Sequence, residues 1–346
     1  MPSCVVLPND ALSAYEKQGN LPQFLDRLEY YRERLGAVTI IDWGKIPAKT
    51  KGKIGFAREP ARFPRPWNQA RALIKHARGV DFIRVFEGGT FTKAFAGVLA
   101  SKATGKPLVV SLHGHHTALA KYYGWSKWAP AMRVAEWLLA HSGALVLANS
   151  RETASRYRGK SRVSTLYVDT EKFKPSNAKK KYDFVYVGSL QRVKNIDGLL
   201  AFIRAVRQRV PRATLAVAGE GPLASKLKAP GVSYLGAVPH DALPRVYASA
   251  RAFVTLTHYE SFGIPVIEAQ ACGLPSFARP VGALRENTAR SSFLGDEREL
   301  VDAAVRLLEK GDWTARGAKA RAFVVKKYSR GAVLERECAA IRAYLR

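Results

Sequence analysis

The sequence predicts an α/β protein of two doubly wound parallel sheets, each forming a Rossmann-like domain. Short apolar runs rich in Val, Ile and Leu alternate with segments of helical periodicity, roughly every 20 to 35 residues. The alternation begins again in the second half of the chain, and 346 residues suit two domains better than one. Polar or glycine-bearing turns follow the apolar runs, which is where open parallel sheets bind their ligands.

The first half contains five runs that are typical of buried parallel strands. These runs are residues 5–7, 37–41, 81–86, 107–112 and 144–150. Helical character between the first two runs is broken at Gly19-Asn20, and Thr90 is expected to cap the helix after the third. The fourth run ends at His113, which is therefore expected at the binding edge of the first sheet.

The second half repeats the pattern more regularly, after a polar stretch at residues 176–181 that suits a linker. Its strand-like runs are residues 182–188, 213–219, 232–236 and 252–256. Residues 197–210 carry apolar side chains at helical spacing, which predicts an amphipathic helix after the first run. Strands separated by helices in this way predict a second parallel sheet.

Composition excludes several classes of protein. The three cysteines are far apart and form no C-x-x-C pair, which argues against a disulfide framework or a zinc site. The N-terminus lacks the pattern of a signal peptide, and no stretch approaches the roughly 20 apolar residues that a membrane helix needs. We therefore expect a cytoplasmic protein, soluble or peripheral at the cytoplasmic face of a membrane.

The net charge of +28 predicts attraction to polyanions, of which nucleic acid and anionic membrane are the two serious candidates. Residues 45–78 hold ten Lys or Arg against one acid, with aromatic side chains among them. The segment suits anionic lipid headgroups, single-stranded nucleic acid, or merely a solvated surface. The expected membrane-docking residues are Lys49, Lys51, Lys53, Arg58 and Trp67.

The stretch 258–270 contains the residues that say most about the chemistry of this protein. It follows a buried strand, and Pro265 suits the first turn of a helix. The backbone amides of residues 262–264 would then form an anion site suited to phosphate. Glu260 and Glu268 bracket this turn, and carboxylates accept hydrogen bonds from sugar hydroxyls. Phosphate between two hydroxyl-rich groups describes a nucleotide sugar.

This stretch resembles the E-x7-E motif of retaining glycosyltransferases with the GT-B fold, most closely glycosyltransferase family 4. Two further segments resemble the family: 188–195 (G-S-L-Q-R-V-K-N) and the link 168–175 (V-D-T-E-K-F-K-P). The resemblance implies two Rossmann-like domains facing across a cleft. It places the acceptor-side domain at residues 1–170, the donor domain at residues 171–328, and a helix returning to the first domain at residues 329–346.

The resemblance also assigns site residues. It implies that Glu260 holds the donor sugar and that Glu268 holds the ribose. Lys194 matches the lysine that neutralises the diphosphate, and Arg192 is expected to replace an arginine that the family usually has at the position of Ser189. His113 matches a histidine near the sugar and phosphate. The remaining expected donor contacts are Gly188, Ser189, Val238, Ser261, Phe262, Gly263 and Ile264, and the expected acceptor-side residue is Gly19.

The implied activity is retaining transfer of a hexosyl unit from a UDP- or GDP-sugar to a glycan or lipid-linked acceptor. No D-x-D motif and no dedicated nucleophile stand out, so we expect no metal and no cofactor, with two cations stabilising the leaving diphosphate. The nucleotide base and the oligomeric state stay open. Two alternatives also stay open: a nucleic-acid-binding protein on a GT-B scaffold, and a GT-B sugar-nucleotide epimerase. No specific nucleic-acid-binding motif is present.

Overall fold

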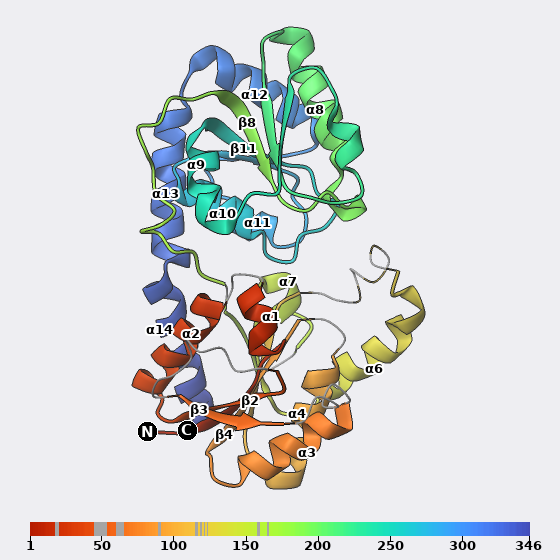
Figure 1. The fold of residues 1–346 in the computed structure, drawn as a ribbon, viewed down its shortest axis with the longest axis vertical. Coiled ribbons are helices and arrows are strands. Elements are labelled where there is room, and N and C mark those ends of the chain that lie inside the picture. The colour runs from red at the N-terminus through yellow and green to blue at the C-terminus, as the bar shows by residue number, and fades with distance from the viewer. Residues whose placement is uncertain are drawn as a thin grey trace. The chain divides into compact units, whose positions relative to one another are not determined.

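The chain folds into two compact units, each built on one parallel sheet (Figure 1). Unit 1 comprises Met1–Thr165 and Leu334–Arg346, and unit 2 comprises Leu166–Val333. The computed structural model describes residues 1–17, 21–44, 54–59, 66–88, 91–114, 117, 120, 122, 124–157, 160–164 and 166–346.

The sheet of unit 1 has seven strands in the order β3-β2-β1-β4-β5-β6-β7, and every pairing is parallel. The strands are β1 (Cys4–Leu7), β2 (Val38–Asp42), β3 (Gly55–Arg58), β4 (Phe82–Glu87), β5 (Leu108–Leu112), β6 (Leu145–Ala148) and β7 (Ser161–Val163). Because all strands run the same way, their carboxyl ends share one edge of the sheet. The two edge strands, β3 and β7, are additions to the five that the sequence predicts.

Helices cover both faces of this sheet. They are α1 (Leu12–Lys17), α2 (Leu21–Arg34), α3 (Pro66–Ala77), α4 (Thr92–Thr104), α6 (Ala129–Ala140) and α7 (Arg151–Ala154). Strand β4 shows the layering, because successive side chains point to opposite faces. Ile83 and Val85 join the core beneath α3 and α4, whereas Arg84 contacts Tyr31 of α2. The residues of α14 (Arg330–Leu345) from Leu334 onward also belong to unit 1.

The sheet of unit 2 has six strands in the order β10-β9-β8-β11-β12-β13, again all parallel. They are β8 (Tyr182–Val187), β9 (Leu215–Ala218), β10 (Val232–Gly236), β11 (Ala250–Thr255), β12 (Ser276–Ala278) and β13 (Phe293–Leu294). The helices are α8 (Ile196–Arg209), α9 (Leu243–Ala248), α10 (Ile264–Ala271), α11 (Leu284–Asn287), α12 (Glu297–Lys310) and α13 (Trp313–Tyr328). One apolar cluster includes α10 and α13, and a second includes α8 and α12.

The predicted fold class, two Rossmann-like parallel-sheet domains, is confirmed. The expected cap of α4 is wrong in its identity. The residue at the cap position is Phe91, in a left-handed conformation (φ 61°), and Thr90 lies outside the described residues. The fully buried carboxylate of Glu87 instead accepts hydrogen bonds from the amides of Lys93 and Ala94, at 3.0 and 3.1 Å. A carboxylate at this position also suits the positive end of the helix dipole.

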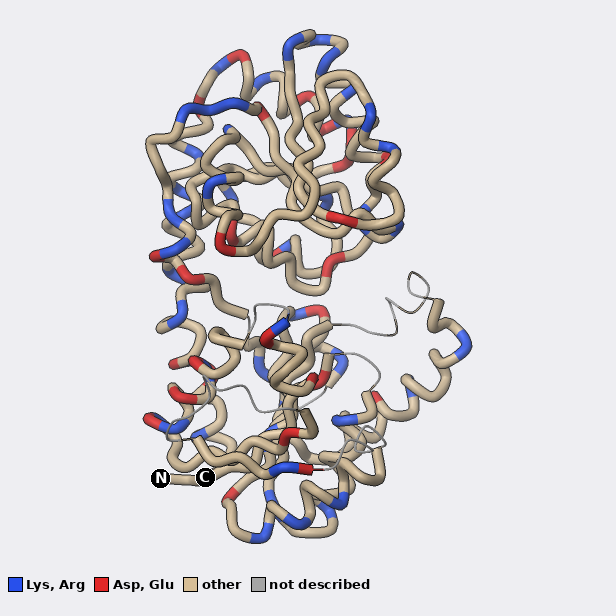
Figure 2. The backbone as a smooth tube through the Cα atoms, viewed as in Figure 1, with Lys and Arg blue, Asp and Glu red and all other residues tan. Residues whose placement is uncertain are grey.

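Charge is distributed over both units, and Figure 2 shows Lys and Arg along most helices and loops. Among the described residues, no helix combines the length and the apolar character required to span a bilayer.

Candidate active site

The loop after β8 is held against the loop after β9 at the carboxyl edge of the second sheet. The amide of Gly188 donates to the carbonyl oxygen of Ala218 at 3.0 Å. Gly219 adopts a φ of 142°, and a Cβ there would stand 1.8 Å from the carbonyl oxygen of Gly188. Only glycine allows this approach of two backbones. Gly188 and Ser189, two expected donor contacts, therefore start from a fixed turn.

The turn that carries Lys194 is tied to the end of β11. The 3₁₀ turn η3 (Arg192–Lys194) ends at Asn195, which is left-handed (φ 53°) and caps α8 by accepting from the amide of Gly198. The Asn195 amide group also donates to the carbonyl oxygen of Leu256 at 3.0 Å. The carbonyl oxygen of Val193 accepts from the His258 amide, at 2.8 Å. These bonds fix the loop of Lys194 beside the loop of Glu260.

Lys194 and Glu260 form an ion pair, with 2.7 Å between Nζ and Oε2. Both side chains are partly buried, at 22% and 17% exposure, so the pair lies at the surface without being freely solvated. The backbone around Glu260 is also held. Its carbonyl oxygen accepts from the amide of Ala283, and a Cβ at Gly282 would stand 2.2 Å from that oxygen. Two predicted site residues, 66 positions apart, are thus brought into direct contact.

Helix α10 begins as the sequence predicts. Gly263 is its N-cap with a φ of 84°, and Pro265 occupies the first turn. Phe262 is buried, and its carbonyl oxygen accepts from the side-chain amide of Asn287 at 2.6 Å. Ser261 is half-buried and Ile264 is exposed. The N-terminus of this helix lies next to Glu260, because a Cβ built at Gly263 would stand 3.2 Å from the Cγ atom of Glu260.

Glu268 lies one turn inside α10 and is 3% exposed. Its Oε1 lies 2.7 Å from Nε2 of His240, and its Oε2 accepts from the hydroxyl of Tyr247 at 2.9 Å. Burial raises the pKa of Tyr247 well above its ordinary value, and the adjacent Glu268 carboxylate adds to this effect. The phenol therefore keeps its proton and donates a hydrogen bond. Neither His240 nor Tyr247 is among the site residues that the sequence predicts. The turn at Val238 and Pro239 was the available signal for His240.

Three other expected residues have simpler surroundings. Arg192 is exposed, and within the part of the chain that the structure describes its guanidinium forms no ion pair. Val238 is half-buried against the core of unit 2. His113 follows β5 in unit 1, where its amide donates to the carbonyl oxygen of Glu87 and its ring lies edge-on to Phe86, with 6.1 Å between centroids.

Some of the remaining predicted residues lie outside the described residues, and the others lie within them. Gly19, Lys49, Lys51 and Lys53 lie outside the described residues. Arg58 is exposed on the edge strand β3, and Trp67 is 64% exposed at the start of α3. Among the described residues there is no group of three or more His, Cys, Asp or Glu side chains placed to hold a metal ion.

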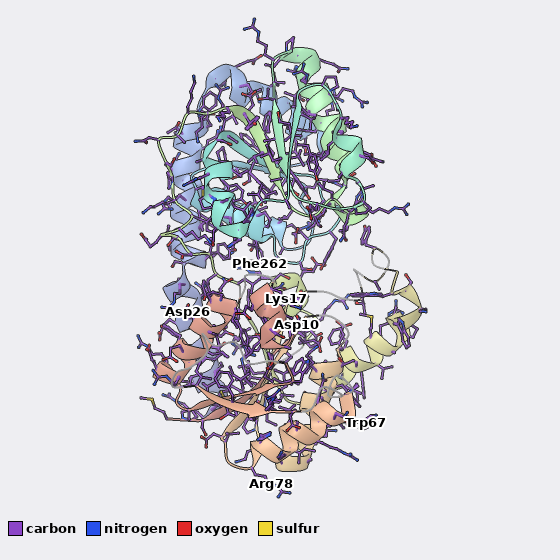
Figure 3. The ribbon with its side chains drawn as sticks, in the orientation of Figure 1. Asp10, Lys17, Asp26, Trp67, Arg78 and Phe262 are labelled. Atoms are coloured by element: carbon purple, nitrogen blue, oxygen red, sulfur yellow. The ribbon has the colours of Figure 1, made fainter. Side chains whose placement is uncertain are left out.

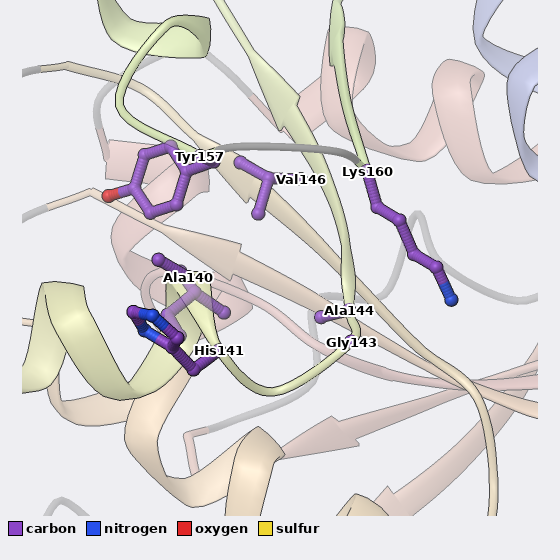
Figure 4. A pocket seen from close by; sticks show the side chains of 8 residues that line it. Ala140, His141, Gly143, Ala144, Val146, Tyr157 and Lys160 are labelled. Atoms are coloured by element: carbon purple, nitrogen blue, oxygen red, sulfur yellow. The ribbon is translucent and has the colours of Figure 1, made fainter.

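A pocket of about 320 Å³ lies elsewhere in unit 1, between the end of α6 and β6. Its lining residues are Leu139, Ala140, His141, Gly143, Ala144, Val146, Tyr157 and Lys160. Figure 4 shows the ammonium of Lys160 pointing away from His141 and Tyr157. The polar groups that line the pocket therefore do not converge on one point. None of the predicted site residues lines it.

Each half of the chain matches a known protein family. Residues 168–315 match the family described as glycosyl transferases group 1, and residues 27–165 match the glycosyl transferase 4-like domain. The chain is 27% identical over 318 residues to the GDP-mannose-dependent alpha-(1-6)-phosphatidylinositol monomannoside mannosyltransferase of Mycolicibacterium smegmatis, covering 76% of this chain and 81% of that protein. It is 34% identical over 158 residues to the O-antigen chain mannosyltransferase B of Escherichia coli, covering 40% of this chain and 41% of that protein.

Solved structures give the same picture of the fold. Anabaena Alr3699/HepE in complex with UDP superposes with a TM-score of 0.76 at 17% identity, covering 99% of this chain and 100% of that one. The lipopolysaccharide outer core galactosyltransferase WaaB superposes with a TM-score of 0.69 at 14% identity, covering 99% of both chains. At such identity the likeness concerns the fold. The chain spans less than half the length of the Escherichia coli relative.

Proposed function

The chain belongs to the GT-B glycosyltransferases of family 4 type, and we propose that it transfers a hexosyl unit, with retention, from a UDP- or GDP-sugar to a glycan or lipid-linked acceptor. The names of two relatives support the donor class, since one is GDP-mannose-dependent and the solved Alr3699/HepE structures contain UDP or UDP-glucose. Mannosyltransferases of an O-antigen chain and of a phosphatidylinositol glycolipid support the acceptor class.

One observation in this chain carries the proposal. The Lys194–Glu260 ion pair lies beside the N-terminus of α10, and that helix buries Glu268 one turn further on. A cation and a helix N-terminus are both attractive to a diphosphate. Glu260 on one side and Glu268 on the other offer carboxylate oxygens to a sugar and to a ribose.

The proposed mechanism follows from these placements. Lys194 and the exposed Arg192 stabilise the charge that develops on the leaving diphosphate, which is how fixed charges lower a barrier without a metal ion. Glu260 positions the donor sugar. The departing phosphate oxygen takes the proton of the acceptor hydroxyl on the same face of the sugar, so the anomeric configuration is retained.

We expect UDP or GDP to raise the melting temperature of the protein. At a concentration of 100 times Kd, a ligand that binds only the folded state stabilises it by about 2.7 kcal/mol. A panel of UDP- and GDP-sugars should be scored by thermal shift and by donor hydrolysis, with and without a chelator of divalent metals. Lys194→Ala should lose the shift, whereas Lys226→Ala, which removes an exposed lysine paired with Asp197, should keep it. If millimolar UDP and GDP give no shift and no donor is hydrolysed, the proposal fails.

A lipid-linked acceptor would require the first domain to approach a membrane, and we propose that α3 contributes to this docking. Trp67, Arg71, Lys75 and Arg78 recur at helical spacing and are all exposed, while the opposite face of α3 is buried. Figure 3 shows Trp67 on α3, and Arg78 directly after the end of this helix, at the outer side of unit 1. A basic stripe with an interfacial tryptophan suits an anionic bilayer.

We expect the protein to sediment with anionic liposomes and not with neutral ones, and to be released by salt. Basic residues near an anionic surface contribute about 1 kcal/mol each, so replacing Arg71, Lys75 and Arg78 by Gln should weaken binding roughly a hundredfold. The matched control replaces three exposed cations of unit 2, Arg204, Lys319 and Lys326, by Gln. Equal loss in both triple variants would mean that net charge alone governs binding, and no binding at low salt would favour a soluble acceptor.

A further inference from the structure

The carboxylate of Glu268 is held between two side chains from other elements of unit 2. Tyr247 belongs to α9, and His240 belongs to the 3₁₀ turn η5 (His240–Ala242) before it. Each oxygen of Glu268 accepts one hydrogen bond from them, at 2.9 and 2.7 Å. A carboxylate oxygen has two acceptor positions, so each oxygen keeps one for a further donor.

A lysine selects the tautomer of His240. Nζ of Lys172 lies 3.3 Å from Nδ1 of His240 and 2.5 Å from Oδ1 of Asp241. An ammonium group only donates hydrogen bonds, so Nδ1 must accept. The proton of the neutral imidazole is then on Nε2, which is the nitrogen that faces Glu268. Lys172 thereby makes His240 a donor to Glu268.

The segment that carries Lys172 is itself held in place. The Oδ1 atom of Asp169 accepts from the amides of Glu171 and Lys172, at 2.9 and 3.0 Å. Phe173 is buried, and its ring lies 5.2 Å from the ring of His240, centroid to centroid. The imidazole is therefore bounded by an aromatic ring, an ammonium group and a carboxylate, although half of its side chain remains exposed.

We propose that His240 is a positioning residue for nucleotide recognition: with Lys172 setting its tautomer, it orients the Glu268 carboxylate so that the free acceptor positions receive the ribose hydroxyls. This inference rests on the proposed function. The inference adds two residues to the site: Lys172, near the start of unit 2, and His240, in the turn after Val238. A carboxylate held by a second layer of hydrogen bonds loses less freedom when the ribose binds.

The test compares dissociation constants of the full chain for UDP or GDP, whichever binds, with those for its 2′,3′-dideoxy analogue. Losing the hydrogen bond to the carboxylate is expected to weaken binding of the ribonucleotide about tenfold in His240→Ala. Binding of the dideoxy analogue should change little, because it lacks the hydroxyls that Glu268 receives. His240→Gln, whose amide nitrogen replaces Nε2 as donor, should restore most of the affinity.

Lys172→Met is expected to give a smaller, ribonucleotide-specific loss, and the matched control Lys226→Met none. If His240→Ala weakens both nucleotides equally, or neither, the inference is overturned. A merely structural role would move both nucleotides together and would also lower the melting temperature of the free protein. If the wild-type protein binds no nucleotide, the proposed function itself fails. If the wild-type protein binds nucleotide and the His240 variants bind it equally well, only the inference about His240 fails.

Discussion

Replacing Glu260 by Ala is expected to lower turnover about a hundredfold while nucleotide affinity stays close to that of the wild type. The carboxylate is proposed to touch the donor sugar and to hold it for attack, so its loss affects the reacting geometry. Nucleotide binding should persist because the partner of Glu260 is Lys194, at 2.7 Å. Removing the carboxylate leaves that ammonium free to interact with the diphosphate.

The measurement separates kcat with a donor sugar from the dissociation constant of the free nucleotide. Glu268→Gln is the informative counterpart, since it keeps a group to which Tyr247 can donate but removes the charge. It should weaken nucleotide binding, because a hydrogen bond to a charged group contributes about 1.5–3 kcal/mol. Glu309→Ala, an exposed carboxylate on α12, serves as the control. If Glu260→Ala and Glu268→Gln lose nucleotide affinity equally, the division of roles is wrong.

Whether a strand can be predicted from the sequence depends on how deeply that strand is buried in the fold. Central strands such as β4, buried along its whole length, form continuous apolar runs that the sequence reveals. The edge strand β3 is exposed at both ends and only half-buried in the middle, and it lies within the basic segment 45–78. Such a strand has no apolar run and no alternation, so its existence depends on pairing with β2, which only the folded chain provides.

The site shows the same distinction between local and long-range information. Gly263 and Pro265 encode the start of α10 locally, and that prediction is confirmed. The partners of the two glutamates depend on contacts between loops far apart in sequence. Lys194 contacts Glu260, and His240 contacts Glu268, because the carboxyl ends of β8, β10 and β11 meet at one edge of the sheet. Topology predicts that such groups gather there, but it does not specify the pairs.

Unit 1 contains a buried ionic cluster that the sequence does not predict. Arg84 of β4 is fully buried and its Nη2 lies 2.7 Å from Oε1 of Glu337, which is also buried, on α14. Arg27 of α2 lies 3.1 Å from the other oxygen of Glu337. The hydroxyls of Tyr31 and Ser111 accept further hydrogen bonds from Arg84, at 3.2 and 2.7 Å. The cluster joins four elements, α2, β4, β5 and α14, and its members lie up to 310 residues apart in the sequence.

Replacing Glu337 by Ala is expected to destabilise unit 1 by about 3–5 kcal/mol, because two buried guanidinium groups would lose their counter-charge. Unfolding in urea can be followed by tryptophan fluorescence, since five of the six tryptophans lie between residues 43 and 137. Glu335→Ala is the comparison on the same helix, because this glutamate is half-exposed and accepts a hydrogen bond from the hydroxyl of Tyr30 at 2.7 Å. Losing that one hydrogen bond should shift the unfolding midpoint far less than Glu337→Ala does.

The cluster also predicts a dependence of stability on pH. Burial alone would raise the pKa of Glu337, but the guanidinium groups of Arg27 and Arg84 outweigh it and bring the pKa below its ordinary value of 4.5. A carboxyl group with a lowered pKa in the folded state stabilises fully above that ordinary value, and its contribution is lost as the pH falls through the lower folded pKa. Glu337→Gln should therefore unfold at a midpoint that depends less on pH than that of the wild type as the pH falls below about 4.5. An unfolding midpoint for Glu337→Ala equal to that of Glu335→Ala would contradict the structural role assigned to the cluster.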